Sequence, residues 1–261
     1  MVYQRTTGPT YPKKVNVELA GQKYKFKLLR SNEIGSPCQV QLPATDKELT
    51  AKIFYKKYKT NDELTIVDMK RMLPEGDDDE VLSATLPEQP AAGKVEYYIE
   101  LSKGGESVFI QKDEPVVVRF KGFVPRYILI PHILFMIISL FAGTRAGVEA
   151  IAGGDKTRKY AIVTLIVLFI GGLILGPLVQ LYAFGELWTG WPFGGDWTDN
   201  KTLFAWIFWL IAVIVLKKKP HNRLWPIIAV MVLFAMYMIP HSMGGSELNN
   251  QTGKIETGMK K

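Results

Sequence analysis

The chain has very little of the chemistry that most enzymes place in their active sites. Cys38 is the only cysteine among 261 residues, and there are only three histidines, at positions 132, 221 and 241. A single cysteine excludes an internal disulfide, a cysteine-based metal site and a dithiol redox pair. The sequence also lacks a glycine-rich phosphate loop, an HExxH motif and a GxSxG motif. These absences favour a protein without catalytic activity of its own and predict no metal site.

Long apolar runs, by contrast, fill the second half of the chain. Four segments are almost free of charge, and the second alone is long enough to cross about 30 Å of hydrocarbon as a purely apolar helix. The segments cover residues 127–143, 160–182, 203–216 and 224–240. The third is short, and we expect Lys201, Thr202 and Lys217 to extend it by reaching toward the membrane interfaces. Because these segments leave almost no polar face for water, they predict four transmembrane helices.

The loops between these segments differ strongly in charge. The outer loop from Ala183 to Thr202 has one cation, Lys201, whereas the two other loops together have eight. Those eight are Arg145, Lys156, Arg158, Lys159, Lys217, Lys218, Lys219 and Arg223. The positive-inside rule therefore places both basic loops in the cytoplasm, and the N-terminal domain, outer loop and tail 241–261 outside. Much of the net charge of +7 comes from these two loops, where it would meet the anionic head groups of the lipid bilayer. Because the basic residues flank membrane segments, we expect no nucleic-acid partner.

The first part of the chain is patterned as β-strands. After an extended lead-in over residues 1–12, apolar and polar residues alternate through residues 13–123, with turn sequences between the runs. Strands at such short spacing, without helical periodicity between them, are typical of an antiparallel sandwich. The predicted fold class is therefore mixed: an all-β antiparallel sandwich followed by a four-helix transmembrane bundle.

Three stretches of this region carry a resemblance to a known type of module. Ile53–Tyr58, Ala84–Pro87 and Gly93–Leu101 resemble strands of extracytoplasmic immunoglobulin-like and fibronectin-III-like modules, and the likeness spans roughly residues 13–120. Such modules carry a tyrosine near the sheet corner, which Tyr97 or Tyr98 would match. The paired cysteines and buried tryptophan of antibody domains are absent. The resemblance implies a binding or spacing role.

The predicted location also sets an expectation for the start of the chain. Residues 1–5 have neither the basic start nor the apolar stretch of a signal peptide. Either the domain crosses as a long N-terminal tail, or a signal or anchor helix lies upstream of Met1; we expect the second. Lysine richness and the absence of disulfides favour a multi-pass protein of the bacterial inner membrane. Its N-terminal domain and C-terminus would then be periplasmic.

Two histidines are candidate ligands. His132 and His241 each follow an Ile-Pro pair, near the predicted outer ends of the first and fourth segments. Ionisable groups at membrane depth are costly and often functional. Two imidazoles on different helices can ligate haem b or hydrogen-bond a quinone, so the cofactor stays open. Interfacial hydrogen bonding without a cofactor is the alternative.

The outer loop adds a second group of candidates. Its carboxylates, with one from the tail, form a possible proton or polar site: Asp196, Asp199, Glu186 and Glu247. Its aromatic residues are predicted to dock on a partner or at the membrane interface: Trp188, Trp191, Phe193 and Trp197. Thr198 or Asp199 is expected to cap the third helix. In the second segment, Gly172 and Gly176 predict close helix packing, and Pro177 a bend.

The leading hypothesis is a non-catalytic membrane subunit whose periplasmic sandwich docks in a larger envelope or respiratory membrane complex. Its partners would be other membrane or periplasmic subunits. The alternative is a redox subunit that holds quinone or haem through His132 and His241. A transporter ranks third, because four helices without a buried charged pair offer little pathway.

Overall fold

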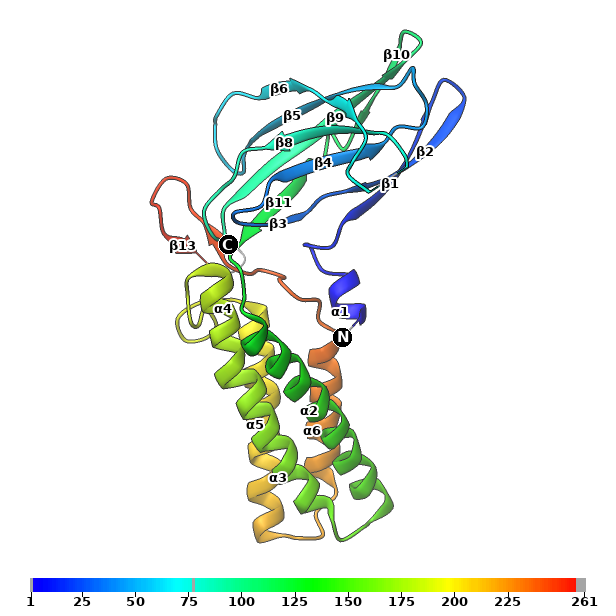
Figure 1. The fold of residues 1–261 in the computed structure, drawn as a ribbon. Helices are drawn as coiled ribbons and strands as arrows, with labels where there is room; N and C mark the ends of the chain where they lie inside the picture. The colour runs from blue at the N-terminus through cyan, green and yellow to red at the C-terminus, as the bar shows by residue number, and fades with distance from the viewer. Residues whose placement is uncertain (1, 77, 257–261) are drawn as a thin grey trace. The chain divides into compact units, whose positions relative to one another are not determined.

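The computed structural model describes residues 2–76 and 78–256. Two compact units are present (Figure 1). The β unit comprises residues 10–122 together with residues 247–255 from the C-terminal part of the chain. The described part of the helical unit comprises residues 2–9, 123–246 and 256.

The β unit is built from three sheets. The largest has the order β3-β11-β9-β5-β6 with β10 beside β9, the second is β4-β8-β7, and β1 pairs with β2 as a hairpin. The strands are β1 (Lys13–Leu19), β2 (Gln22–Leu28), β3 (Ser31–Glu33), β4 (Cys38–Pro43), β5 (Thr50–Lys57), β6 (Thr65–Asp68), β7 (Lys70–Met72), β8 (Val81–Leu86), β9 (Lys94–Lys103), β10 (Glu106–Ile110) and β11 (Val116–Lys121). A two-stranded element of β12 (Glu247–Leu248) and β13 (Ile255–Glu256) follows the helices.

Alternation along the strands builds one apolar core. In β9, Val95, Tyr97 and Ile99 are fully buried, while the residues between them lie on the opposite face of the sheet. Buried side chains from β4 and β8 belong to the same core cluster. The buried Tyr97 hydroxyl donates a hydrogen bond to the carbonyl oxygen of Leu29 at 3.0 Å. Burial raises the pKa of Tyr97, so this phenol is held as a neutral donor.

The prediction of purely antiparallel pairing is wrong at one edge. β3 pairs in parallel with β11, with Ser31 opposite Arg119 and Glu33 opposite Lys121. Only Leu29 and Arg30 separate β2 from β3, and the short strand takes the free edge of a distant strand instead of forming a hairpin. Such a pairing leaves no local turn signature, because parallel partners are joined by long connections.

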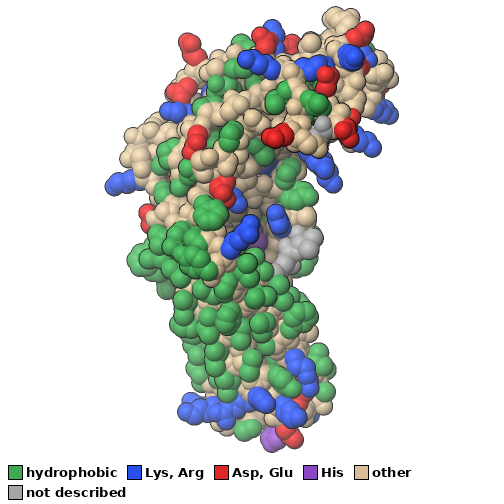
Figure 2. Space-filling view, in the orientation of Figure 1, with side chains coloured by type: hydrophobic (Ala, Val, Ile, Leu, Met, Phe, Trp, Pro, Cys, Tyr) green, Lys and Arg blue, Asp and Glu red, His purple; other side chains and the backbone are tan. Residues whose placement is uncertain are grey.

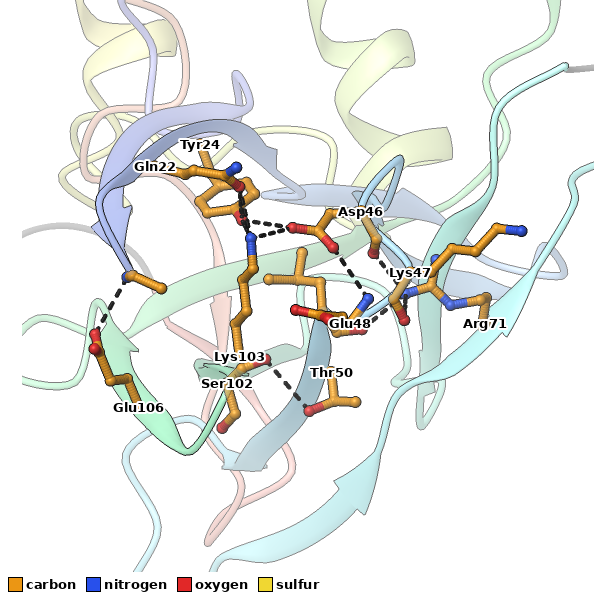
Figure 3. A network of polar contacts seen from close by, with 12 residues as sticks. Gln22, Tyr24, Asp46, Lys47, Glu48, Thr50, Arg71, Ser102, Lys103 and Glu106 are labelled. Carbon is orange, nitrogen blue, oxygen red and sulfur yellow. Dashed lines mark hydrogen bonds and ion pairs between the residues drawn. The ribbon is translucent and has the colours of Figure 1, made fainter.

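A polar network fixes the loop between β4 and β5 (Figure 3). The Arg71 guanidinium donates to the carbonyl oxygens of Ala44 at 2.6 Å and Leu49 at 2.8 Å. The Lys103 ammonium lies 2.5 Å from the Asp46 carboxylate, which also accepts from the Tyr24 hydroxyl. Hydrogen bonds from Lys103 hold the pKa of Asp46 below its usual range. These contacts satisfy loop carbonyls that no strand partner reaches.

The helical unit contains three helical stretches long and apolar enough to cross a membrane: Arg126–Ala152, Thr157–Phe184 and Trp197–Lys218. The elements are α1 (Val2–Thr6), α2 (Arg126–Ala152), α3 (Thr157–Leu168), the π-helix η1 (Phe169–Leu175), α4 (Gly176–Phe184), α5 (Trp197–Lys218) and α6 (Leu224–Met238). α6 is apolar but has only 15 residues. α2 packs against α3 and α6, and α5 packs against the same two helices.

Two of these helices extend well beyond the predicted apolar segments. α2 continues past residue 143 to Ala152 and ends at Gly153, whose φ of 72° gives a left-handed cap. The charged Arg145 and Glu149 lie within this helix, where they pair at 2.5 Å as i and i+4 neighbours. α5 begins at Trp197, six residues before position 203. In both cases, charged residues that interrupt an apolar run remain compatible with a helix.

Small residues line the interior of the helical unit. A Cβ on Gly143 would lie 2.6 Å from Leu233 Cδ2, and one on Gly147 would lie 2.6 Å from Val230 Cγ1. These contacts allow α2 and α6 to approach closely beside the fully buried Trp209. Large apolar side chains lie on the outside instead, as the green surface of the helical unit in Figure 2 shows. This distribution suits helices surrounded by hydrocarbon.

Candidate functional site

The loop from Gly185 to Asp196 is organised by a buried polar network at one end of the helical unit, here called the loop end. The Thr189 amide donates to Asp199 Oδ2 at 2.7 Å. The Thr189 hydroxyl lies 3.2 Å from Asp196 Oδ2 and 3.3 Å from Asp199 Oδ2, and it accepts from the Gln180 side-chain amide. All four of these residues are buried. Two of the four acids of the predicted polar site, Asp196 and Asp199, therefore hold one threonine in place.

Further contacts close the loop. Asp196 is the cap of α5, because its Oδ1 accepts from the Thr198 amide at 2.7 Å. The predicted cap at Thr198 or Asp199 is wrong because the helix begins earlier than its apolar run. The Trp191 amide donates to Asn200 Oδ1 at 2.6 Å. Gly190 fits because a Cβ there would lie 2.7 Å from Asp199 Cβ.

Lys201 joins the start of α5 to the end of α6. Its ammonium donates to the Ile239 carbonyl oxygen at 3.0 Å, and the Gln4 side chain of α1 donates to the same oxygen at 3.2 Å. Pro240 follows Ile239, and a cation near helix-terminal carbonyls is favoured by the helix dipole. Lys201 is only 5% exposed, so it does not reach outward to the interface as the sequence predicted.

His132 lies against the π-helix. Its Nδ1 is 2.8 Å from the Gly171 carbonyl oxygen, which also accepts from the Gly176 amide five residues along. Because a carbonyl only accepts, Nδ1 carries the proton, and Nε2 of the neutral ring is an acceptor. π-turns inside helices are frequent at functional positions. The wide turn also precedes Pro177, whose ring cannot continue a regular hydrogen-bond ladder.

His241 lies at the same end as His132. Its backbone amide donates to the Gln4 carbonyl oxygen at 3.3 Å, and it lies within electrostatic range of Lys201 and His132. The side chain is exposed, whereas His132 is partly buried. The structure thus brings the two candidate histidines to one end of the unit, in different surroundings.

The remaining predicted carboxylates lie elsewhere. Glu186 is exposed in the loop, and Glu247 belongs to the β unit. Glu247 accepts from Lys94 at 2.6 Å and from Lys59 at 2.8 Å. Burial opposes ionisation, yet these two hydrogen bonds hold the pKa of Glu247 below its usual range. The Leu248 amide donates to the Ala92 carbonyl oxygen at 3.0 Å, so this segment of the tail is bound to the β unit.

The predicted docking residues are mostly exposed. Phe193 is 83% exposed, Trp191 is 67% exposed and Trp197 is 39% exposed. The Trp188 indole donates to the Trp191 carbonyl oxygen at 3.1 Å and so supports the turn beneath them.

The two glycines predicted to pack helices have different surroundings. A Cβ on Gly172 would lie 2.3 Å from Thr202 Cγ2 of α5, so this position requires glycine. At Gly176 the nearest atoms would be 3.7 Å and 3.8 Å away, the second being His132 Cε1. Gly171 is not part of the predicted pair, but it also allows a close approach, because a Cβ there would lie 2.7 Å from Phe135 Cβ of α2.

Within residues 2–76 and 78–256, no group of three or more His, Cys, Asp or Glu residues is placed to hold a metal ion. The sequence patterns did not indicate a role for Gln180 or Thr189, and they placed Lys201 only at the membrane interface. One available signal was the single amide, Gln180, in an otherwise apolar run. A scan against protein-family models found no match to the chain, and a search of curated proteins found none.

Proposed function

We propose that the chain is an integral membrane subunit with four membrane crossings, whose β unit is an extracytoplasmic sandwich that docks on another protein of a larger complex. The observation that carries the docking role is an apolar stripe on the outward face of the largest sheet. This stripe, called here the aromatic stripe, consists of Phe54, Ile66, Tyr98 and Phe109.

The aromatic stripe crosses neighbouring strands in register. Phe54 of β5 lies opposite both Tyr98 of β9 and Ile66 of β6. The Phe54 and Tyr98 rings stack with centroids 4.7 Å apart, and Phe109 of β10 meets Tyr98 edge-on at 6.1 Å. Ile66 is 58% exposed and Phe109 is 41% exposed, although the opposite face of these strands supplies the core. A contiguous exposed apolar patch of this kind is typical of an interaction surface.

Charges beside the aromatic stripe favour a protein partner. Lys52 lies 4.0 Å from Asp68, and Lys56 lies 3.4 Å from Glu96, so the flanking charges are balanced. An apolar centre with a mixed polar rim is the usual composition of a protein interface. Binding to an anionic lipid surface would instead favour an excess of cations.

The bound tail supports four crossings. Residues 122 and 247 belong to the same compact β unit, which would lie on one side of the bilayer. An even number of crossings must therefore separate them, whereas three helical stretches among the described residues have full spanning length. α6 supplies the fourth in this proposal, since its 15 residues reach about 22 Å and the bilayer accommodates such a mismatch.

The basic loops supply the orientation. Arg223 packs against Gly153, so the loops after α2 and α5 lie at the same end of the helical unit, opposite the loop end. Their cations would face the cytoplasm of a bacterial inner-membrane protein, with the β unit in the periplasm. A membrane-impermeant thiol reagent tests this in intact cells that produce Cys38→Ser protein with one new cysteine. Lys254→Cys should react and His221→Cys should not; reaction at both or only at position 221 contradicts the topology.

Site-specific photocrosslinking tests docking in native membranes. A photoreactive residue at Ile66 should give an adduct of one defined mass, whereas one at exposed Lys25 of β2 should not. Ile66→Asp should abolish the corresponding larger species on a native gel while leaving the amount of protein unchanged. A native mass equal to the monomer, with no adduct at position 66, contradicts docking.

The alternative function is a redox subunit that uses His132. The hydrogen bond from Nδ1 to Gly171 fixes the tautomer that leaves Nε2 available to a haem iron, as second-shell contacts commonly do. In this tautomer the unprotonated Nε2 can accept a hydrogen bond from a quinol hydroxyl but cannot donate one to a quinone carbonyl. A reduced-minus-oxidised spectrum of the purified protein decides the question: a haem band lost in His132→Ala supports ligation, and a featureless spectrum excludes it.

A further inference from the structure

The loop from Gly185 to Asp196 reverses the usual distribution of side chains in a connecting loop. Asp196 and the adjoining Asp199 are 4% and 6% exposed. Three outward side chains are apolar: Leu187 is 50% exposed, and Trp191 and Phe193 are 67% and 83% exposed, while Glu186 at the start of the loop is also exposed. Water would favour the opposite arrangement, with carboxylates outside and aromatic rings inside.

The exposed rings are held out by hydrogen bonds from the first turn of α5 and within the loop. Thr189 is fixed by Asp199, and Trp191 is fixed through its amide by Asn200. The Phe193 amide donates to the Gly190 carbonyl oxygen at 2.9 Å, which closes the turn between these anchor points. The apolar tip is therefore built on a fixed base and is presented as a surface.

The position of the loop between two apolar helices indicates the environment of that surface. It connects α4, which ends at Phe184, directly to α5, which begins at Trp197. Exposed apolar residues continue onto both helices, with Tyr182 at 42% and Phe204 at 50%. A short loop between two spanning helices is held at the level of the lipid head groups, where amphipathic aromatic side chains are favoured.

We propose that Leu187, Trp191 and Phe193 form a lipid foot, a surface that inserts into the interfacial region of the surrounding phospholipid bilayer. The inference rests on the proposed membrane insertion of α2 to α6. Burial of Asp196 and Asp199 keeps their carboxylates away from the inserted surface, whereas the exposed Glu186 lies at the start of the loop. The Trp188 indole is bonded within the loop. The lipid foot fixes the depth of the loop end in the membrane.

Spin-label accessibility in proteoliposomes tests the lipid foot. The full chain with Cys38→Ser carries a nitroxide at Phe193→Cys and is reconstituted in phosphatidylcholine vesicles with a minority of phosphatidylglycerol. Collision with oxygen reports contact with hydrocarbon, and collision with a water-soluble nickel chelate reports contact with water. Two reference positions accompany it: Phe141→Cys on α2, where the phenylalanine is 70% exposed, and Lys25→Cys on the exposed side of β2.

We expect the label at position 193 to collide severalfold more with oxygen and severalfold less with nickel chelate than the label at position 25. High nickel accessibility at position 193 places the tip in water and overturns the proposal. Low accessibility to both reagents places it in a protein contact and also overturns it. If position 141 itself is in water, the membrane insertion of the proposed function fails; if only position 193 is, the lipid foot alone fails.

Discussion

The β unit and the helical unit differ in where their large apolar side chains lie. In the β unit, large residues such as Ile53, Tyr97 and Phe120 are fully buried, and ion pairs lie at the surface. In the helical unit, Phe141 and Ile151 are 70% and 64% exposed, and alanine and glycine occupy much of the interior around the buried Trp209. Burial of large apolar side chains away from water stabilises the first unit. The second has close backbone packing and large apolar side chains on its outside, which is the pattern of helices that pack in hydrocarbon.

The largest expected difference between the two units is the loss of stability when a large side chain is truncated in each. Ile99→Ala should destabilise the β unit by about 2–5 kcal/mol, because it leaves a cavity in a fully buried position. Phe141→Ala should change the stability of the helical unit little, since the ring points outward. Urea unfolding in detergent, with pulse proteolysis to separate the two units, measures both. Equal losses would contradict the difference in burial.

Substitutions at two glycines of the second apolar segment test close helix packing, with a smaller expected loss of stability. Gly172→Ala should destabilise the helical unit by about 1–3 kcal/mol, because the new methyl group would overlap Thr202. Gly176→Ala is the matched control, with only ordinary contacts around the new methyl, and should be neutral or stabilising by up to about 1 kcal/mol. Thermal denaturation in detergent compares the two variants. Equal effects would show that the helices do not approach at Gly172.

The smallest effect concerns the tail segment held by Glu247. The pKa of Glu247 is lowered in the folded protein. The carboxylate therefore stabilises the bound tail fully above its unfolded-state pKa of about 4.3, and this stabilisation is lost as the pH falls through the folded-state pKa. Release of the tail should therefore become easier below about pH 4, by roughly 1 kcal/mol or less. Hydrogen exchange at the Leu248 amide measures this release.

Glu247→Gln is the control for that pH dependence. It should speed exchange at Leu248 near neutral pH and remove most of the acid dependence, because the variant has no carboxylate to protonate. An acid dependence in the variant as strong as in the parent protein would assign it to other groups.

Local patterns in the sequence predict much of the architecture. β8 lies within the alternating region predicted over residues 13–123, and the hairpin of β1 and β2 follows the same alternation. Three helical stretches of spanning length occur where apolar runs predict them. These features succeed because each depends on the periodicity of one short segment.

Features that depend on distant segments could not be predicted. The parallel edge of β3 is set by a strand more than eighty residues away, and the short β12 has no alternation long enough to detect. At the loop end, Lys201 meets Ile239 and His132 meets Gly171 only after the helices have packed. The sequence shows that these polar groups exist near membrane depth, but their partners are a property of tertiary structure.

The bound tail has a consequence for how the protein is made. Lys94 and Glu247 are separated by 153 positions, and α2 to α6 are synthesised between them. The ribosome therefore finishes most of the β unit early, yet that unit gains its last two-stranded element only after α6 has been translated. A chain arrested before that point would leave Ala92 and Lys94 uncovered. The bound tail on the surface of the β unit, the part made first, therefore shows that synthesis has passed α6.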